Sequence, residues 1–134
     1  MSNKMITSTA IFTFHEDGIV EMRSNPDNDW SKPHTVEDAE ENVKALQDRD
    51  LDYQLAYVVE FPDSYLNAEV RDVYLSYGNL LCAAIVVDSF AKAVIASTMV
   101  KKKKDVPLKV FSKFDKALSW ARNQLTIHKN NKES

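Results

Sequence analysis

The chain has 134 residues, of which 44% are hydrophobic and 28% are charged, and its formal net charge is −3 at pH 7. This length suits one domain with a substantial core, and the composition excludes an intrinsically disordered chain. The negative net charge excludes a general electrostatic attraction to nucleic acid.

The cysteine usage and the lack of long apolar runs indicate a compartment. The one cysteine, Cys82, lies in an apolar run, so we expect a buried thiol in a reducing environment and no internal disulfide. No secretory signal is visible at the N-terminus, and no apolar run reaches the ~20 residues that a membrane-spanning helix needs. We therefore expect a cytoplasmic protein without a transmembrane segment. We place a single domain over residues 1–134, with an ordered core at about 8–128.

The first predicted elements form a β-hairpin. In the run TAIFTF, residues 9–14, the side chains alternate with the period of a strand. Asp17 and Gly18 supply a tight turn because glycine accepts a positive φ. Val20 and Met22 then alternate with charged residues in a second strand.

Two helix–strand units follow the hairpin. Thr35 caps the first helix, and Asp38 completes a capping box. The run DYQLAYVVEF, residues 52–61, predicts the next strand. Asn67 caps a second helix, which Gly78 ends. The apolar residues that we expect to face inward from these two helices are Val36, Ala39, Val43, Leu46, Val70, Val73, Tyr74 and Tyr77.

The run LLCAAIVV, residues 80–87, contains no polar residue, which is typical of a central parallel strand covered on both faces. Asp88 or Ser89 caps the helix that follows. This third helix is apolar over more than half of its circumference, so we expect a second protomer or an apolar cavity beside it. Its broader apolar side is expected to comprise Phe90, Ala91, Val94, Ile95 and Met99, and a shallower one comprises Ala93, Ala96 and Val100.

Four lysines, residues 101–104, end the third helix. We interpret them as a solvated basic end that opposes the helix dipole. The alternative is a patch for anionic surfaces, joined by Lys109, Lys113 and Lys116. Nucleic-acid binding is not favoured, because interleaved arginines and stacking aromatic side chains are missing.

The last predicted elements are a short strand in VPLKVF, residues 106–111, and a fourth helix. Ser112 is its expected cap, with Asp115 completing a box, and the tail from His128 is expected to fray. The inward stripe of this helix comprises Phe114, Ala117, Leu118, Ala121 and Leu125. The order of elements predicts an α/β fold with about five strands, mostly parallel with the first antiparallel, and four helices joined by right-handed crossovers.

Four phrases, in this order over residues 8–125, carry a family resemblance: EDGIVEMRS, TVEDAEENVKAL, VVDSFAKAVIAS and PLKVFSKFDKALSWARNQL. Together they resemble the STAS/SpoIIAA-like superfamily, and most of all its bacterial group of STAS-like domains of unknown function. The resemblance implies a SpoIIAA-like fold and a non-catalytic regulatory or protein-interaction module.

The phosphoserine switch of that superfamily is not intact in this chain. The Asp-Ser-Ser-Gly motif of the family is absent: Asn67 stands where the helix-starting hydroxyl is expected, and Ser64 lies three residues earlier in the loop. A similarity in topology to the lipid-binding CRAL-TRIO domains implies an alternative, a small-ligand or lipid-binding domain with an apolar pocket beside the sheet.

In an open parallel sheet, the loops that leave the carboxyl ends of the strands meet at one edge, where ligands bind. Helix N-termini at that edge favour anions. The simpler interpretation is helix capping by Thr35, Asn67, Ser89 and Ser112, which any function requires. The candidate ligand or partner residues at this edge are Trp30, His34, Asp63, Ser64, Asn67, Asp88 and Ser89.

The usual catalytic and cofactor motifs are missing from the sequence. The three histidines lack metal-binding spacing, no G-x-S-x-G motif occurs, and two glycines cannot form a glycine-rich phosphate loop. We expect no enzyme, no metal and no cofactor; catalysis by Asp63 or His34 is the least supported alternative. A protein partner, a second copy of the chain, and a small apolar or anionic ligand all remain open.

Overall fold

The computed structural model describes residues 3–48, 55–64, 66–77 and 80–133. It contains one sheet with the strand order β1-β2-β3-β4-β5-β6 and four helices, which confirms the predicted α/β class. The first two strand pairs are antiparallel, and the remaining three are parallel. The elements are β1 Lys4–Ile6, β2 Ala10–Phe14, β3 Ile19–Ser24, α1 Val36–Asp48, β4 Leu55–Glu60, α2 Ala68–Leu75, β5 Leu80–Val86, α3 Phe90–Lys102, β6 Leu108–Phe111 and α4 Phe114–Glu133.

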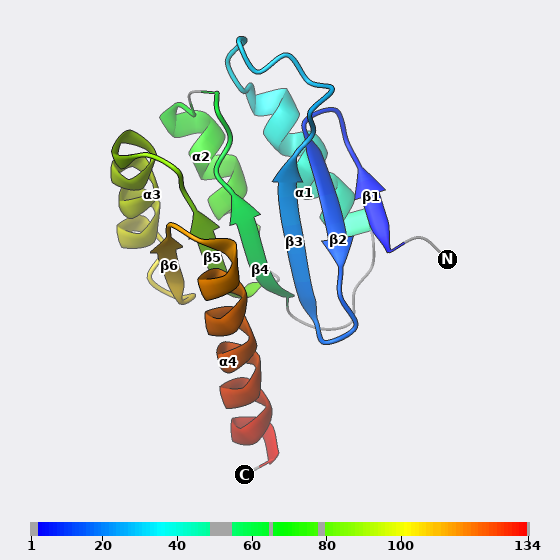
Figure 1. Cartoon of the computed structure of the whole chain (residues 1–134), viewed down its shortest axis with the longest axis vertical. Coiled ribbons are helices and arrows are strands. Elements are labelled where there is room, and N and C mark those ends of the chain that lie inside the picture. The colour runs from blue at the N-terminus through cyan, green and yellow to red at the C-terminus, as the bar shows by residue number, and fades with distance from the viewer. Residues whose placement is uncertain (1–2, 49–54, 65, 78–79, 134) are drawn as a thin grey trace.

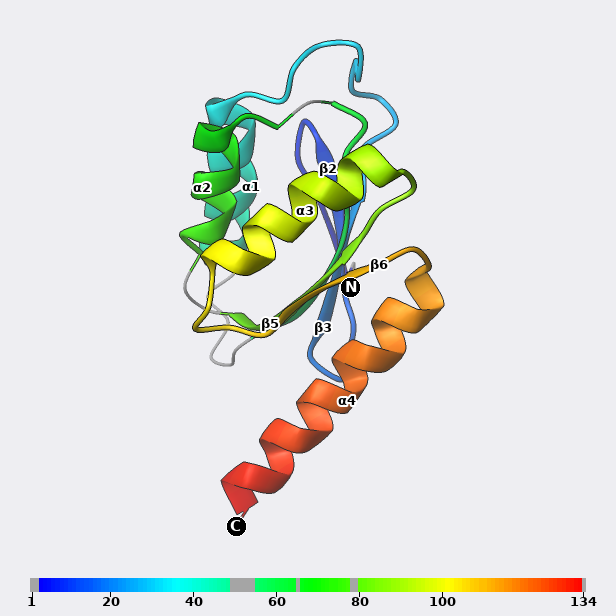
Figure 2. The ribbon, with the colours of Figure 1, turned by 90° about the vertical axis from the view of Figure 1, so that its left-hand side faces the viewer.

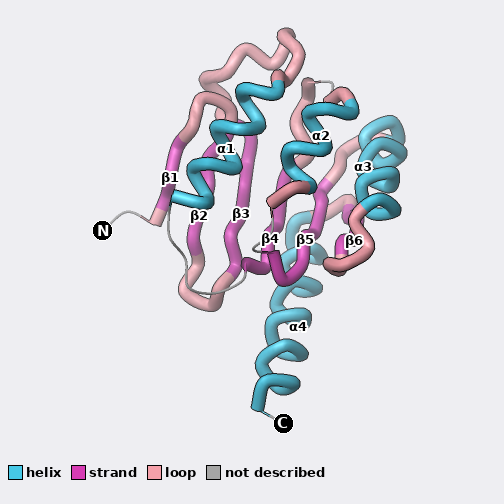
Figure 3. Tube along the Cα trace, turned by 180° about the vertical axis from the view of Figure 1, so that it is seen from behind, coloured by secondary structure: helices cyan, strands magenta, loops and turns pink. Residues whose placement is uncertain are grey.

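The helices form two unequal layers on the sheet. Figure 3 shows α1, α2 and α3 in front of the strands, while α4 passes behind them and extends beyond the sheet. Figure 2, turned from the view of Figure 1, shows α4 on the side of the sheet opposite to α1 and α2. The strand order follows the chain order, so each parallel crossover places its helix on the same face, as a constant right-handed connection requires.

The hairpin forms as predicted. Gly18 has a φ of 96°, a value that a side chain with a Cβ disfavours. Phe14 pairs with Val20, and Ala10 pairs with Ser24 at the other end of the same ladder. Arg122 of α4 reaches back to the turn, where its Nε lies 3.1 Å from Oδ2 of Asp17.

β5 is a middle strand covered on both faces, as LLCAAIVV predicts. It pairs in parallel with β4 and β6. Cys82, Ala84 and Val86 pack against α4, and the alternate residues face the other three helices. The small, fully buried Ala117 and Ala121 allow α4 to approach the sheet closely.

The predicted caps are mostly present. The hydroxyl of Thr35 accepts from the amide of Asp38 at 3.1 Å, and the Asp38 carboxylate accepts from the amide of Thr35 at 3.0 Å. Asn67 accepts from Val70 at the start of α2. Of the two candidates for α3, Ser89 is the cap, and it accepts from Lys92.

Three predictions about the ends of the chain and its caps are corrected. The sheet has a sixth strand, β1, because the short N-terminal segment adds antiparallel to β2. α4 begins at Phe114, which leaves Ser112 one residue outside the cap position. The tail from His128 does not fray in the structure but continues α4, since no glycine or proline interrupts it. The predicted terminator Gly78 and the first three residues of the run 52–61 lie outside the described residues.

α3 buries one residue from each of its two predicted apolar sides. Met99 of the broader side and Ala96 of the shallower side are buried. Phe90 and Val94 of the broader side are 84% and 49% exposed. Ala96 is completely buried beside the sheet, where a small side chain permits a close approach, and this turns the bulky Phe90 outward. Within the described parts of the chain, no helix combines the length and the apolar character needed to cross a membrane.

Candidate functional site

The loops after β3 and β4 are joined at the carboxyl-end edge of the sheet. The hydroxyl of Ser64 donates to the backbone oxygen of Lys32 at 2.7 Å and lies 3.1 Å from that of Trp30. Trp30 in turn donates from Nε1 to the backbone oxygen of Asn25 at 2.8 Å. Ser64 is buried, so its hydroxyl holds two loops together and is not presented to solvent.

His34 is also enclosed at this edge. It is 4% exposed, and its ring stacks between Trp30, at a centroid distance of 6.2 Å, and Tyr74, at 5.8 Å. Its Nε2 lies 2.6 Å from the Tyr74 hydroxyl, whereas its buried Nδ1 has no hydrogen-bond partner among the residues that the structure describes. Burial lowers the pKa of His34, so the ring is held in its neutral form.

A buried hydrogen-bond network continues from Tyr74 to Asn42. Nδ2 of Asn42 donates to the Tyr74 hydroxyl and to the Thr9 hydroxyl, both at 2.9 Å, and its Oδ1 accepts from the Thr7 hydroxyl. Because the Tyr74 oxygen accepts from Asn42, its own proton can point to Nε2 of His34. This direction of donation places the ring proton of His34 on the unpartnered Nδ1.

Asp63 and Asp88 meet at a second point of the edge. The ammonium of Lys92 contacts both carboxylates, and its distance to Oδ1 of Asp88 is 2.8 Å. The hydrogen bond from Lys92 lowers the pKa of Asp88. Asn67 and Ser89 are occupied as helix caps, as described above. The edge therefore brings the seven predicted residues into two clusters, Trp30–His34–Ser64 and Asp63–Asp88, with the two caps beside them.

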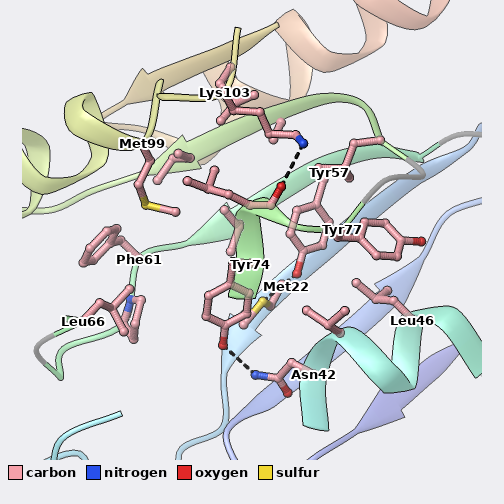
Figure 4. Close-up of a pocket in the computed structure, with 18 residues that line it drawn as sticks. Met22, Asn42, Leu46, Tyr57, Phe61, Leu66, Tyr74, Tyr77, Met99 and Lys103 are labelled. Atoms are coloured by element: carbon pink, nitrogen blue, oxygen red, sulfur yellow. Dashed lines mark hydrogen bonds between the residues drawn. The ribbon is translucent and has the colours of Figure 1, made fainter. Parts of the chain in front are cut away.

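A hollow with a largely apolar wall lies away from this edge, between the sheet and the layer of α1, α2 and α3. It is an apolar cavity of about 80 Å³, and Figure 4 shows the side chains that converge on it. None of the seven edge residues lines it. The lining residues are Met22, Asn42, Val43, Leu46, Tyr57, Val59, Phe61, Pro62, Leu66, Tyr74, Leu75, Tyr77, Leu80, Ala83, Ile85, Met99, Lys103 and Leu108.

The few polar groups of this wall mostly face each other. Tyr74 and Asn42 are bonded in the network above, and the Tyr57 hydroxyl donates to the thioether sulfur of Met22 at 2.7 Å. Burial raises the pKa of Tyr57 and of Tyr74, so both hydroxyls stay protonated. The wall is therefore apolar in character, and Lys103 is its charged group.

Lys103 lies where α2 and α3 both end. Its ammonium donates to the backbone oxygen of Leu75, the last residue of α2, at 2.8 Å. Lys102 forms an ion pair with Asp72 of α2. These two lysines of the predicted basic run therefore join α2 to α3, while Lys101 and Lys104 are exposed, as a solvated helix end requires.

Sequence reasoning missed Asn42 and Lys103 as parts of a site. Asn42 stands at a core-facing position of α1, three residues after Ala39 and four before Leu46, and a polar residue at such a position was the available signal. Lys103 gave no such signal, because the sequence does not distinguish it from the other three lysines of the run 101–104.

Among the described residues, no three histidine, cysteine, aspartate or glutamate side chains are grouped so that they could hold a metal ion. Comparisons with protein-family models, curated proteins and solved structures found no match.

Proposed function

We propose that the chain is a non-catalytic binding module whose ligand is a small, largely apolar molecule held between the sheet and α1, α2 and α3. The observation that carries the proposal is the 80 Å³ apolar cavity. The hollow is partly open at its rim, so its apolar wall is accessible to a ligand. A ligand that covers this wall would gain about 25 cal/mol for each Å² of apolar surface that it removes from water.

The state of the edge residues supports the absence of catalysis in this proposal. His34 is enclosed and neutral, and Asp63 and Asp88 share the ammonium of Lys92. A general acid or base must reach the proton that it transfers, and none of these three groups lines the cavity. We also propose that the chain belongs to the STAS/SpoIIAA-like superfamily and that ligand binding has a regulatory role.

The test is a cavity-filling substitution. Ala83 lines the cavity from β5, whereas its neighbour Ala84 faces α4 on the other side of the sheet. We expect Ala83→Leu to abolish the increase in melting temperature that xenon or a short-chain alcohol gives the wild type, and Ala84→Leu to retain it at a lower starting stability. No stabilisation of the wild type by any small apolar probe, together with no molecule co-purified in native mass spectrometry, refutes the proposal.

A second candidate function is self-association through α3. Phe90 and Val94 form an apolar strip on its outer face, with exposed fractions of 84% and 49%. Asp88 precedes this helix, and Lys101 and Lys104 lie at its end, all of them exposed. A second copy that covers this strip would remove both apolar side chains from water. We expect a dimer in sedimentation that Phe90→Glu dissociates; a wild-type monomer at high concentration overturns this candidate.

A further inference from the structure

Lys103 places a positive charge against the apolar cavity in unusual surroundings. Its side chain is only 12% exposed and lines the cavity, and Figure 4 shows its ammonium hydrogen-bonded to the main chain. The carboxylate that pairs with it, Asp105, is 77% exposed, and the two charged groups are 3.8 Å apart. That separation is longer than the 2.7–2.9 Å of a charge-assisted hydrogen bond.

The contacts described for Lys103 do not use the full capacity of its ammonium. A lysine has three N–H donors, and the backbone oxygen of Leu75 accepts from one of them at 2.8 Å. This bond by itself is ordinary capping of α2, whose negative dipole end partly balances the charge. A nearly buried charge is normally paired at hydrogen-bond distance. Here the counterion, Asp105, is exposed to solvent and lies beyond that distance.

The size of the cavity limits the apolar part of a ligand. Its 80 Å³ is about half of the ~150 Å³ of an engineered apolar cavity that binds benzene in another protein. A short acyl chain suits this space, while a long-chain lipid would force the helices away from the sheet. The hydroxyl of Tyr74 and the amide of Asn42 are already bonded to each other, so they do not compete with Lys103 for a polar head group.

We propose that the ligand is a small amphiphilic carboxylate, whose short acyl chain fills the cavity and whose carboxylate accepts hydrogen bonds from Lys103. This inference rests on the proposed function and gives its ligand a chemical class. Lys101, Lys102 and Lys104 add positive charge near the same rim, which attracts anions to it. The expected ligand bridges from the interior of the helical layer to the ends of α2 and α3.

The experiment titrates the full chain with butanoate, pentanoate and hexanoate and with the alcohols of equal length, by calorimetry. We expect affinity to rise about fourfold for each added methylene until the cavity is full. Each carboxylate is expected to bind on the order of tenfold or more tightly than its alcohol. Lys103→Met keeps the aliphatic stem and removes the charge, so it should reduce the carboxylates to the affinity of the alcohols.

Matched variants separate the site from general attraction. Lys101→Met removes one charge from the same lysine run at an exposed position, and we expect it to leave carboxylate binding within about twofold of the wild type. Lys103→Arg keeps the charge and should retain most of the preference for carboxylates. An unchanged amide NMR spectrum outside the cavity confirms that the Lys103 variants are folded.

The outcomes distinguish the two proposals. Equal binding of alcohols and carboxylates, unaffected by Lys103→Met, overturns the carboxylate inference and leaves the apolar site standing. Equal losses in Lys103→Met and Lys101→Met, without any dependence on chain length, also overturn it and indicate adsorption of anions at the lysine run. Failure of every probe of either type to bind refutes the proposed function as well.

Discussion

The hydroxyl of Tyr74 links His34 and Asn42 in one buried hydrogen-bond network, and its removal tests the contribution of that network to stability. This hydroxyl accepts from Asn42 Nδ2 at 2.9 Å and lies 2.6 Å from Nε2 of His34. Tyr74→Phe leaves one buried N–H of Asn42 and one buried ring nitrogen of His34 without a partner. Each buried polar group left in this way costs about 1–3 kcal/mol, so for the two groups we expect a loss of about 2–6 kcal/mol of unfolding free energy.

The matched control is Tyr57→Phe. Tyr57 is a buried tyrosine in the same cavity wall, but its hydroxyl donates to the sulfur of Met22, which is a weak acceptor. We expect this variant to lose less than about 1 kcal/mol. Urea unfolding followed by tryptophan fluorescence gives both values by linear extrapolation. If Tyr74→Phe costs no more than Tyr57→Phe, the buried network contributes little to stability and the reasoning fails.

The remaining predictions concern His34, Gly18 and Cys82. Burial lowers the folded-state pKa of His34 below 6.5, so the unfolded chain takes up the proton first as the pH falls. The free energy of unfolding should therefore be constant above about pH 6.5 and fall below it. Urea midpoints measured from about pH 8 to pH 5 should show this fall in the wild type and a smaller fall in His34→Gln. Gly18→Ala places a Cβ at a φ of 96° and should cost about 1–2 kcal/mol in the same assay, whereas a cost near zero would show that the turn rearranges freely. Burial raises the pKa of Cys82 to about 11, so iodoacetamide should label it only in urea, and rapid labelling of the native chain would contradict its place in β5.

The elements that the sequence predicted well are those with a local cause. The turn at Gly18 follows from backbone conformation, and the capping box at Thr35 requires only residues three positions apart. The run LLCAAIVV predicted a covered middle strand because both of its alternating faces are apolar. Such signals are contained within a few neighbouring residues.

The features that could not be predicted depend on contacts between distant parts of the chain. The face of α3 that is buried depends on the fit of Ala96 against the sheet, since apolar residues occur around most of this helix. The bond from Lys103 to Leu75 joins residues 28 positions apart. The cavity is a defect in packing among three helices and the sheet, and the pattern of apolar residues does not encode such a defect.

At the predicted edge, the sequence identified which residues come together but not how they are used. Asp63 and Asp88 do share Lys92, and Trp30, His34 and Ser64 do form one cluster. Their placement in the loops followed from sheet topology, whereas the burial of His34 follows from aromatic stacking that has no signature in the sequence.

The placement of α4 alone on its side of the sheet gives each side its own optical signal. Trp120 packs with Phe111 on the α4 side, at a centroid distance of 5.7 Å, while Trp30 stacks on His34 in the loop that precedes α1. Variants that keep only one of the two tryptophans therefore give a fluorescence signal from one layer at a time. Trp30 does not line the cavity, but it stacks on His34, which stacks on the cavity residue Tyr74. A molecule that enters between the strands and the three-helix layer is therefore expected to change the Trp30 emission through this stack, and Trp120 on the opposite side of the sheet serves as the reference.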